Sequence, residues 1–285
     1  MILNDEIYNS VISNNKKFTE LDDNYCLLYK TMPCTDDELE LYIDSINKAK
    51  ANGINVTRIL EYKLNNNITH TFKIGSYTKG VFLEEKAKGK CIAENRNLHL
   101  NIDDEYEIDL VANQYKAKIE KYLDELEKRA NANQEIYDKL VNDYMELNKY
   151  NLTPDPKPLN FFFDENTGFT IIDLLPTKEL EVSKNMLPMY MYLILFGYGL
   201  PKISICDTTE KNIPVYYKNR LDKCILQINK KIFCTLNKVG VNKDIIQETM
   251  TSFTSRFNFI GVEKDFIQIL NERYYNIKGD SLKSL

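Results

Sequence analysis

Residues 153–176 gather the side chains of this chain that are best suited to chemistry. Asp155, Lys157 and Asn160 fall within six residues, and Asp173 follows after an apolar stretch. Mg²⁺ is a hard cation that prefers oxygen ligands, and a carboxylate with an amide oxygen would supply two of them. A second carboxylate can orient a hydroxyl group, and a lysine can neutralise phosphate charge. Together these are the parts that phosphoryl transfer requires.

A β-hairpin is the element that would bring these side chains together. Residues 161–163 (FFF) and 169–172 (FTII) are rich in β-forming side chains, and the intervening DENTG has a length that hairpin turns use. Asn160 immediately precedes the first run and Asp173 immediately follows the second. Paired strands lie about 5 Å apart, so we expect Asn160 and Asp173 to lie side by side at the open end of the hairpin. The same residue types are common in surface loops, and the prediction therefore depends on their combination.

The N-terminal part of the sequence predicts a small sheet with one helix. Thr35 is a suitable N-cap with Glu38 three residues later, which is a capping-box pattern, and Gly53 is a natural stop for the helix. Runs of β-forming residues, separated by turn residues, predict strands at residues 8–13, 18–21, 24–32, 55–64, 69–77 and 79–87. Lys30 lies near the end of the third of these strands.

The remainder of the sequence predicts helices. Residues 108–150 have an almost purely helical pattern, with a break at residues 131–133 (NAN). Further helical runs are expected at residues 184–198, 214–238, 243–258 and 262–275. The predicted fold class is therefore α+β, with a β-rich lobe at residues 1–88, a helical lobe at residues 89–285 and a hinge near residues 84–89.

Composition and charge argue against several classes of function. The chain of 285 residues has a formal net charge of −5, so it lacks the basic surplus typical of nucleic-acid binders. Its two histidines and the lack of a C-x-x-C pair argue against a zinc site and against most histidine-dependent hydrolase mechanisms. The apolar run at residues 186–200 contains Pro188 and is shorter than the about 20 residues of a membrane span, so we expect a buried helix there. The N-terminus lacks a signal-peptide pattern, and we expect a cytoplasmic protein without a membrane span.

The motif DPKPLN…IID resembles the catalytic and metal-binding loops of the protein-kinase-like superfamily, which includes Ser/Thr protein kinases and the aminoglycoside- and choline-type small-molecule kinases. The resemblance extends over most of residues 20–200. It implies that Asp155 is the catalytic aspartate and that Asn160 and Asp173 hold Mg²⁺. It also implies that Lys157 matches the catalytic-loop lysine of Ser/Thr kinases.

Upstream, CLLYK is similar to the strand that carries the ATP-binding lysine, which implies this role for Lys30. The following helix should carry the acidic partner of this lysine. The candidates are Glu40, which we favour, and its rivals Glu38 and Asp44. The segment KGVFLEEKAKG resembles the strand that leads into the hinge, which would place adenine against the backbone around Glu85 and Ala87.

The sequence also departs from the pattern of this superfamily. No glycine lies between Met1 and Lys30, where a Gly-rich phosphate loop would be expected. Thr153 and Pro154 replace the His and Arg that precede the catalytic aspartate. Asp173 is followed by two leucines, and no A-P-E motif occurs.

The resemblance implies a two-lobed, ATP- and Mg²⁺-dependent enzyme that transfers the γ-phosphate to an acceptor hydroxyl on a protein Ser or Thr. An alternative is a small-molecule kinase; a cationic acceptor would need an acidic pocket, for which residues 103–109 (DDEYEID) are a candidate lining. A further alternative is a pseudokinase that acts as a scaffold and binds a partner through its helical lobe. The missing glycines support this last alternative.

Overall fold

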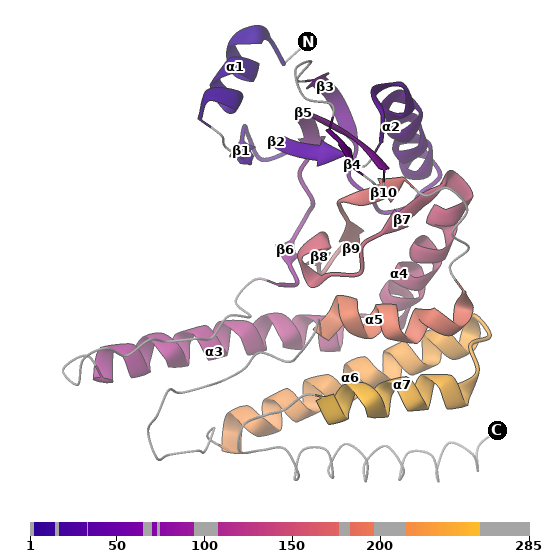
Figure 1. Ribbon diagram of the computed structural model, residues 1–285. Helices are drawn as coiled ribbons and strands as arrows, with labels where there is room; N and C mark the ends of the chain where they lie inside the picture. The colour runs from indigo at the N-terminus through magenta and orange to yellow at the C-terminus, as the bar shows by residue number, and fades with distance from the viewer. Residues whose placement is uncertain are drawn as a thin grey trace. The chain divides into compact units, whose positions relative to one another are not determined.

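The computed structural model describes residues 3–14, 17–32, 34–64, 70–72, 75–93, 108–176, 183–196 and 215–256. These residues form antiparallel strands and α-helices (Figure 1), which confirms the predicted α+β class. In this part of the chain, no helix combines the length and the apolar character that a membrane crossing needs.

The chain contacts define two compact units. The first unit consists of Met1–Gly89, Asn142–Asp155 and Asn160–Val182. The second unit consists of Lys90–Val141, Pro156–Leu159 and Ser183–Leu285. The predicted lobes at residues 1–88 and 89–285 stay a prediction. Most of the candidate site residues belong to the first unit, which is therefore described first.

The first unit contains an antiparallel sheet in which four strands follow the order β1, β2, β5, β3. Their bounds are β1 Phe18–Glu20, β2 Tyr25–Met32, β5 Gly75–Glu85 and β3 Ile59–Leu64. The short strand β4 (His70–Phe72) pairs with the beginning of β5. The strands predicted at residues 18–21 and 24–32 are confirmed. The strand predicted at residues 79–87 is the larger part of β5, and the one predicted at residues 69–77 contributes to both β4 and the beginning of β5.

The helix α1 (Asp5–Ser13) covers one face of this sheet, so the strand predicted at residues 8–13 is wrong. Asn4 caps the helix by accepting a hydrogen bond from the backbone N–H of Ile7 at 2.9 Å. Apolar residues of the helix pack against a cluster in the sheet made of Leu27, Val81 and Leu83. The apolar positions of this run fit a helical period as well as a strand, and the cap together with the packing surface selects the helix.

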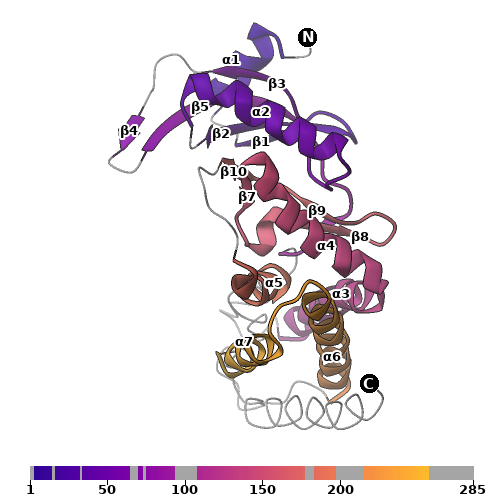
Figure 2. The ribbon, with the colours of Figure 1, turned by 90° about the vertical axis from the view of Figure 1, so that its right-hand side faces the viewer.

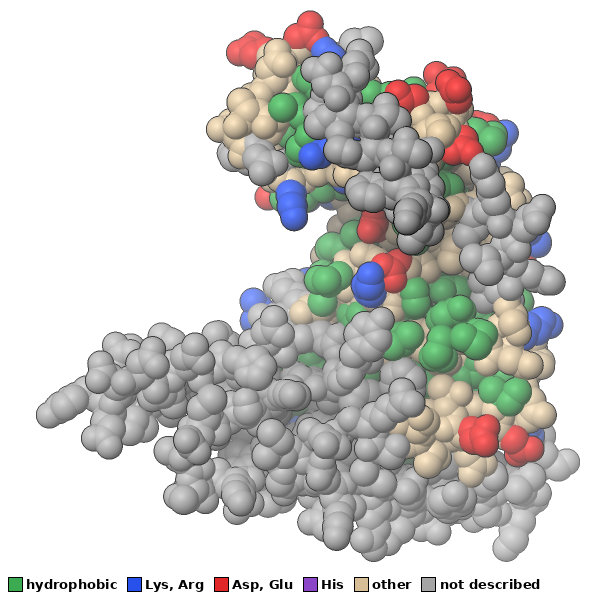
Figure 3. All heavy atoms as spheres, viewed as in Figure 1, with side chains coloured by type: hydrophobic (Ala, Val, Ile, Leu, Met, Phe, Trp, Pro, Cys, Tyr) green, Lys and Arg blue, Asp and Glu red, His purple; other side chains and the backbone are tan. Residues whose placement is uncertain are grey.

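The helix α2 (Asp36–Ala51) begins with the predicted capping box. Glu38 N–H donates to the Thr35 hydroxyl at 3.3 Å, and Thr35 N–H donates to the Glu38 carboxylate at 3.0 Å. The Thr78 hydroxyl of β5 donates to Asp36 at 2.5 Å, which ties α2 to the face of the sheet opposite α1 (Figure 1 and Figure 2). Acidic side chains gather on the outside of both helices (Figure 3), as expected for solvated first turns.

Four short strands complete the first unit. They form two ladders: β7 (Leu152–Pro154) pairs with β10 (Leu174–Pro176), and β8 (Phe161–Asp164) pairs with β9 (Gly168–Ile171). The second ladder is the predicted hairpin. Its paired Phe163 and Phe169 rings lie 5.0 Å apart, centroid to centroid. At its turn, Asp164 accepts hydrogen bonds from the backbone N–H groups of Asn166 at 2.9 Å and Thr167 at 3.0 Å.

The second unit is mainly helical. Its described elements are β6 Lys90–Cys91, α3 Ile108–Asn131, the larger part of α4 Gln134–Glu146, η3 Pro158–Asn160 up to Leu159, η4 Lys184–Met186, α5 Leu187–Phe196, α6 Val215–Lys238 and α7 Lys243–Arg256. The predicted break at residues 131–133 and the helices predicted from residues 184, 214 and 243 are confirmed, whereas the run at 262–275 lies outside the described residues. Arg220 of α6 forms a bidentate ion pair with Glu127 of α3, with both N–O distances at 2.8 Å. Helices α5, α6 and α7 lie side by side (Figure 2).

Candidate functional site

The open end of the β8–β9 hairpin brings Asn160 and Asp173 next to each other. Phe161 pairs with Ile171, and the backbone N–H of Ile172 donates to the Asn160 carbonyl at 2.9 Å. The pairing therefore continues one step beyond the hairpin, and Asp173 is the next residue. The hairpin pattern predicted this placement, whereas the roles of both residues as metal ligands stay predictions.

The β7–β10 ladder brings Asp155 to the same place. Leu174 of β10 pairs with Pro154 of β7, so Asp173 and Asp155 flank the same end of this antiparallel ladder. The side-chain amide of Asn160 donates to the Asp155 carbonyl at 3.2 Å. Since this bond uses the amide nitrogen, the amide oxygen of Asn160 remains available as an acceptor. Two short ladders thus gather two carboxylates and one amide oxygen.

The backbone at Asp173 adopts a conformation that is uncommon for a residue with a side chain. Its φ is 52°, in the left-handed region, and Asn151 is the only other non-glycine residue in the described part of the chain with a positive φ. Asn151 ends a 3₁₀ helix (η2, Leu147–Tyr150), where such a conformation is ordinary. At Asp173 the conformation turns the chain sharply from β9 into β10. Backbone strain of this kind is concentrated at functional sites.

Two buried tyrosines anchor the loops that carry the aspartates. The Tyr144 hydroxyl donates to the Pro154 carbonyl at 3.3 Å, directly before Asp155. The Tyr42 hydroxyl of α2 donates to the Leu174 carbonyl at 2.5 Å, directly after Asp173. Both tyrosine side chains are buried, so each bond satisfies a carbonyl that water does not reach.

Tyr42 lies near charged groups of both the loop that carries Asp173 and the strand β5. Burial raises the pKa of Tyr42 well above its usual value, and the carboxylates of Glu84 and Asp173 raise it further. The phenol therefore lies within the electrostatic reach of an acid on β5 and of the candidate metal ligand. This places Asp173, Tyr42 and Glu84 in one neighbourhood.

Lys30 forms an ion pair with Glu84 of the adjacent strand β5. The exposed fractions are 18% for the lysine side chain and 7% for the glutamate side chain. Lys30 pairs with Gly80 and Cys26 pairs with Glu84, so strand alternation puts both charged side chains on the same face. The Lys30 ammonium also lies 5.6 Å from the centre of the Phe82 ring. The pair is thus held on the face of the sheet that α2 covers.

The predicted partner of Lys30 on α2 is not the one that the structure provides. Glu40 accepts a hydrogen bond from the Tyr62 hydroxyl at 3.4 Å near the protein surface. Its rivals are also engaged elsewhere, because Glu38 completes the capping box and Asp44 pairs with Lys48 on the surface of α2. The acid that reaches Lys30 comes from the sheet, where helix spacing could not have revealed it.

Glu84 and Tyr42 are the site residues that sequence reasoning missed. A signal for Glu84 was present, since a charged residue in the apolar run VFLEE needs a partner if the strand is buried. Lys30, in the neighbouring predicted strand, was an available partner of opposite charge. Tyr42 gave no such signal, because it is part of an ordinary apolar helical stripe.

The other three predicted site residues, Glu85, Ala87 and Lys157, each lie in separate surroundings. The Glu85 side chain accepts a hydrogen bond from Arg58 Nε at 2.8 Å, on the opposite face of β5 from Glu84. Ala87 lies in the segment after β5, so any contact of adenine with this segment would involve its backbone, as the sequence suggested. Lys157 is exposed and belongs to the second unit.

The donor set of the site fits a hard cation. Asp155, Asn160 and Asp173 offer only oxygen atoms, which suit Mg²⁺. In the described ranges no group of three or more His, Cys, Asp or Glu side chains gathers at a metal-binding distance. The candidate set here, in contrast, consists of two aspartates and an amide.

No protein-family model matches the chain, and no curated protein matches it. Among solved structures, the chain is similar to the kinase domain of a specific rhoptry antigen from Toxoplasma gondii, with 7% sequence identity and a TM-score of 0.27. The match covers 87% of this chain and 74% of that one.

Proposed function

We propose that this protein is an ATP- and Mg²⁺-dependent phosphotransferase with a two-lobed, kinase-like fold. The observation that carries the proposal is the convergence of Asp155, Asn160 and Asp173 at the shared end of two short ladders. Asp155 and Asp173 lie at the two ends of the stretch of residues 155–173, so the fold brings together side chains that are separated along the chain. The charge pair between Lys30 and Glu84 supports it.

The residues would divide the chemistry as follows. Asn160 and Asp173 would hold Mg²⁺, which when bound neutralises phosphate charge. Asp155 would orient the acceptor hydroxyl and accept its proton. Lys30 would contact the α- and β-phosphates, and Lys157 would neutralise charge on the transferred group.

Glu84 would act as a positioning residue for Lys30. A lysine side chain has four rotatable carbons, and an acidic partner restricts its ammonium to one region. Because Glu84 lies on the strand beside Lys30, the pair does not depend on the placement of α2. The site therefore has a lysine whose position is determined within the sheet.

The acceptor hydroxyl belongs to a protein Ser or Thr in the version that we favour. The alternative is a small-molecule acceptor, and residues 103–107 of the acidic segment considered for it lie outside the described residues.

A pseudokinase that acts as a scaffold is the second candidate function, and a specific observation favours it. The segment before Lys30 contains no glycine, and its described residues include the helix α1. A nucleotide would therefore lack the flexible backbone amides that a glycine-rich loop supplies to phosphates.

Calorimetry of ATP binding, with and without Mg²⁺, tests the proposed function. We expect the wild-type protein to bind ATP in a Mg²⁺-dependent manner. Asp173→Ala should lose this dependence, because it removes the carboxylate ligand. Glu165→Ala is the matched control, since it removes an exposed carboxylate from the turn at the other end of the same hairpin.

The outcomes separate the two candidates. Mg²⁺-dependent binding that survives in Glu165→Ala and is lost in Asp173→Ala would support the phosphotransferase. No ATP binding by the wild type would contradict it and favour the scaffold. Equal Mg²⁺-dependent binding by the wild type and Asp173→Ala would remove Asp173 from the metal site.

A further inference from the structure

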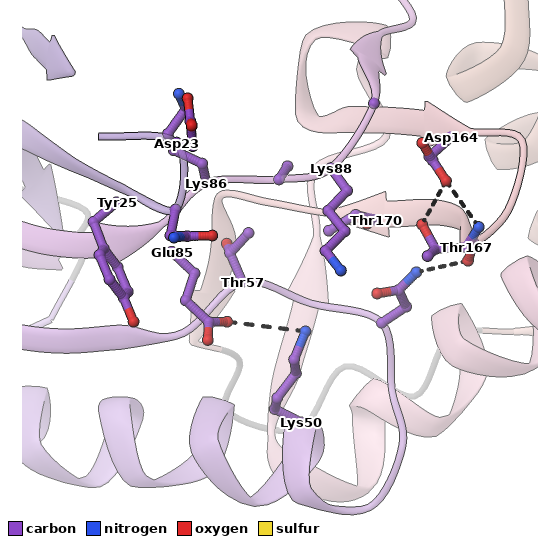
Figure 4. Close-up of a pocket in the computed structure, with 14 residues that line it drawn as sticks. Asp23, Tyr25, Lys50, Thr57, Glu85, Lys86, Lys88, Asp164, Thr167 and Thr170 are labelled. Carbon is purple, nitrogen blue, oxygen red and sulfur yellow. Dashed lines mark hydrogen bonds and ion pairs between the residues drawn. The ribbon is translucent and has the colours of Figure 1, made fainter. Parts of the chain in front are cut away.

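The first unit contains a polar pocket that Asp155, Asn160 and Asp173 do not line, although Glu85 and Ala87 of the segment considered for adenine do. Its volume is about 720 Å³, within the range of about 300–1,000 Å³ typical of small-molecule pockets. Lining residues come from β2, α2, the segment after α2, β5 and the residues that follow it, and the β8–β9 hairpin (Figure 4). Glu85 lines this pocket, whereas its neighbour Glu84 points to the other face of β5 and pairs with Lys30.

A short parallel pairing determines which side chains form the floor of the pocket. Val56 bridges Ile171 of β9, the Ile171 N–H donates to the Asn55 carbonyl at 2.9 Å, and the Thr57 N–H donates to the Ile171 carbonyl at 3.3 Å. Val56 and Ile171 are buried in the core. Because successive side chains of extended chain alternate, Asn55, Thr57 and Thr170 lie on the other side, where they line the pocket.

The two threonines of the floor have unused hydroxyl groups. Thr57 is 9% exposed and Thr170 is 5% exposed, so each residue is at least nine-tenths buried. Within the described part of the chain, neither side-chain hydroxyl has a hydrogen-bond partner, although both residues line the pocket (Figure 4). Neither hydroxyl oxygen is among the fully buried atoms without a partner, so both open into the pocket, where a ligand or water can reach them.

Two lysines direct positive charge to the same space. The Lys50 ammonium donates to the Val56 carbonyl at 2.7 Å and lies 3.9 Å from a Glu85 oxygen. The Lys88 ammonium has no hydrogen-bond or ion-pair partner among the residues that the structure describes, but its charge helps to lower the pKa of the Asp164 carboxylate. Figure 4 shows both side chains extending toward the space beside Thr170. A phosphate between them can accept hydrogen bonds from both ammonium groups.

The acids that line the pocket are largely engaged by other groups. Glu85 accepts from Arg58 Nε at 2.8 Å and from Arg58 Nη2 at 2.5 Å. Asp164 accepts from two backbone N–H groups and one hydroxyl of its own turn. Asp23 lies at the end of the pocket away from Lys50 in Figure 4. Glu85 and Asp164 therefore have donors of their own, whereas the Thr57 and Thr170 hydroxyls and the Lys88 ammonium have no hydrogen-bond partner among the described residues.

We propose that this pocket binds the phosphate group of a small molecule, at a site separate from Asp155, Asn160 and Asp173. A phosphate group accepts hydrogen bonds on several oxygens at once, which matches two ammonium groups and two hydroxyls. The volume leaves room for the body of the molecule beside its phosphate. This inference does not depend on the proposed phosphotransferase activity.

Titration calorimetry with inorganic phosphate on the full-length protein tests the proposal. Removal of one charged hydrogen bond weakens binding about tenfold, so Lys88→Gln should bind phosphate about tenfold more weakly than the wild type. Thr170→Val keeps the shape of the side chain and removes its hydroxyl, and it should weaken binding severalfold. Acetate, titrated separately, should bind more weakly than phosphate because it has fewer acceptor oxygens.

Two controls make the assignment specific. Lys48→Gln removes a positive charge from the exposed side of α2, where Lys48 pairs only with Asp44 in the described structure, and it should bind phosphate like the wild type. Asp173→Ala should also retain phosphate binding. Wild-type affinity in both Lys88→Gln and Thr170→Val would overturn the proposal, as would loss of phosphate binding in Asp173→Ala. Equal affinity for acetate would overturn the phosphate assignment.

Discussion

Lys30 and Glu84 form a charge pair that is largely removed from water, on neighbouring strands of one sheet. Two buried charges lose much of their hydration, and their attraction offsets this loss only while both are present. Replacement of one partner leaves the other uncompensated. Replacement of both by apolar residues of similar size is often neutral for stability.

At the residue scale we therefore expect Glu84→Gln to destabilise the protein by about 3 kcal/mol, measured as the free energy of unfolding in urea. Glu40→Gln, which changes an exposed acid of α2, should stay within about 0.5 kcal/mol of the wild type. The double variant Lys30→Met, Glu84→Leu should recover most of the lost stability.

The same variants separate stability from function. The double variant should fold and yet lack ATP turnover, because the lysine that we propose to contact phosphate is gone. Full turnover in the double variant would show that neither residue has a role in the reaction. A larger loss of turnover in Glu40→Gln than in Glu84→Gln would restore the α2 residue as the partner of Lys30.

At the element scale, the Tyr42 side chain attaches the loop that carries Asp173 to α2. Tyr42→Phe would leave the buried Leu174 carbonyl without its donor, which should cost about 1–3 kcal/mol of unfolding free energy. Tyr62→Phe is the control, since the Tyr62 hydroxyl meets Glu40 near the surface at 3.4 Å, and its effect should be small. Equal effects of the two substitutions in thermal denaturation would contradict the anchoring role of Tyr42.

The segment after β5 approaches the β8–β9 hairpin closely at Gly89. A Cβ atom on Gly89 would lie 2.1 Å from the Phe163 carbonyl oxygen, and φ at this glycine is +81°. Gly89→Ala should therefore lower the melting temperature strongly, since backbone would have to move.

Gly53 provides the comparison for this substitution. Its φ is +84°, but an added Cβ would meet nothing within 4 Å among the described residues. Gly53→Ala should cost only the about 1–2 kcal/mol of a left-handed backbone conformation. A Gly89→Ala variant as stable as Gly53→Ala would show that the close approach to Phe163 is absent in solution.

At the scale of the whole molecule, both units contain buried cysteines whose reactivity depends on the fold. Burial raises the pKa of Cys26 and Cys34 in the first unit, and of Cys224 in the second, to about 11 in each case. The thiolate is the reactive form, so these thiols should resist alkylation in the native protein. Cys234 is exposed and should react first.

Peptide mass spectrometry after brief alkylation checks this order, and denaturant should make all of these thiols reactive. The raised pKa values also predict a pH dependence of stability. The folded state retains these protons where the unfolded state loses them, so the free energy of unfolding should fall as pH rises from 9.0 to about 11. Fast labelling of Cys26 without denaturant would contradict the described core of the first unit.

Local patterns predicted a large part of this fold. The capping box at Thr35, the helix break at residues 131–133 and the β8–β9 hairpin each depend on residues close together in the sequence. The hairpin pattern was also enough to place Asn160 beside Asp173, because the two residues flank its strands. The helix α1 was missed because a short apolar run fits two periods, and packing against the sheet selects one of them.

The sequence by itself thus determined the α+β class, most elements and the meeting of Asn160 with Asp173, since short-range backbone preferences decide these features. Only the tertiary structure decided that Glu84 pairs with Lys30, that Tyr42 holds the loop after Asp173, and that Thr57 and Thr170 share a pocket. The physical reason is that such contacts depend on strand register and on which faces pack together. Residues far apart along the chain set both, and no local pattern records them.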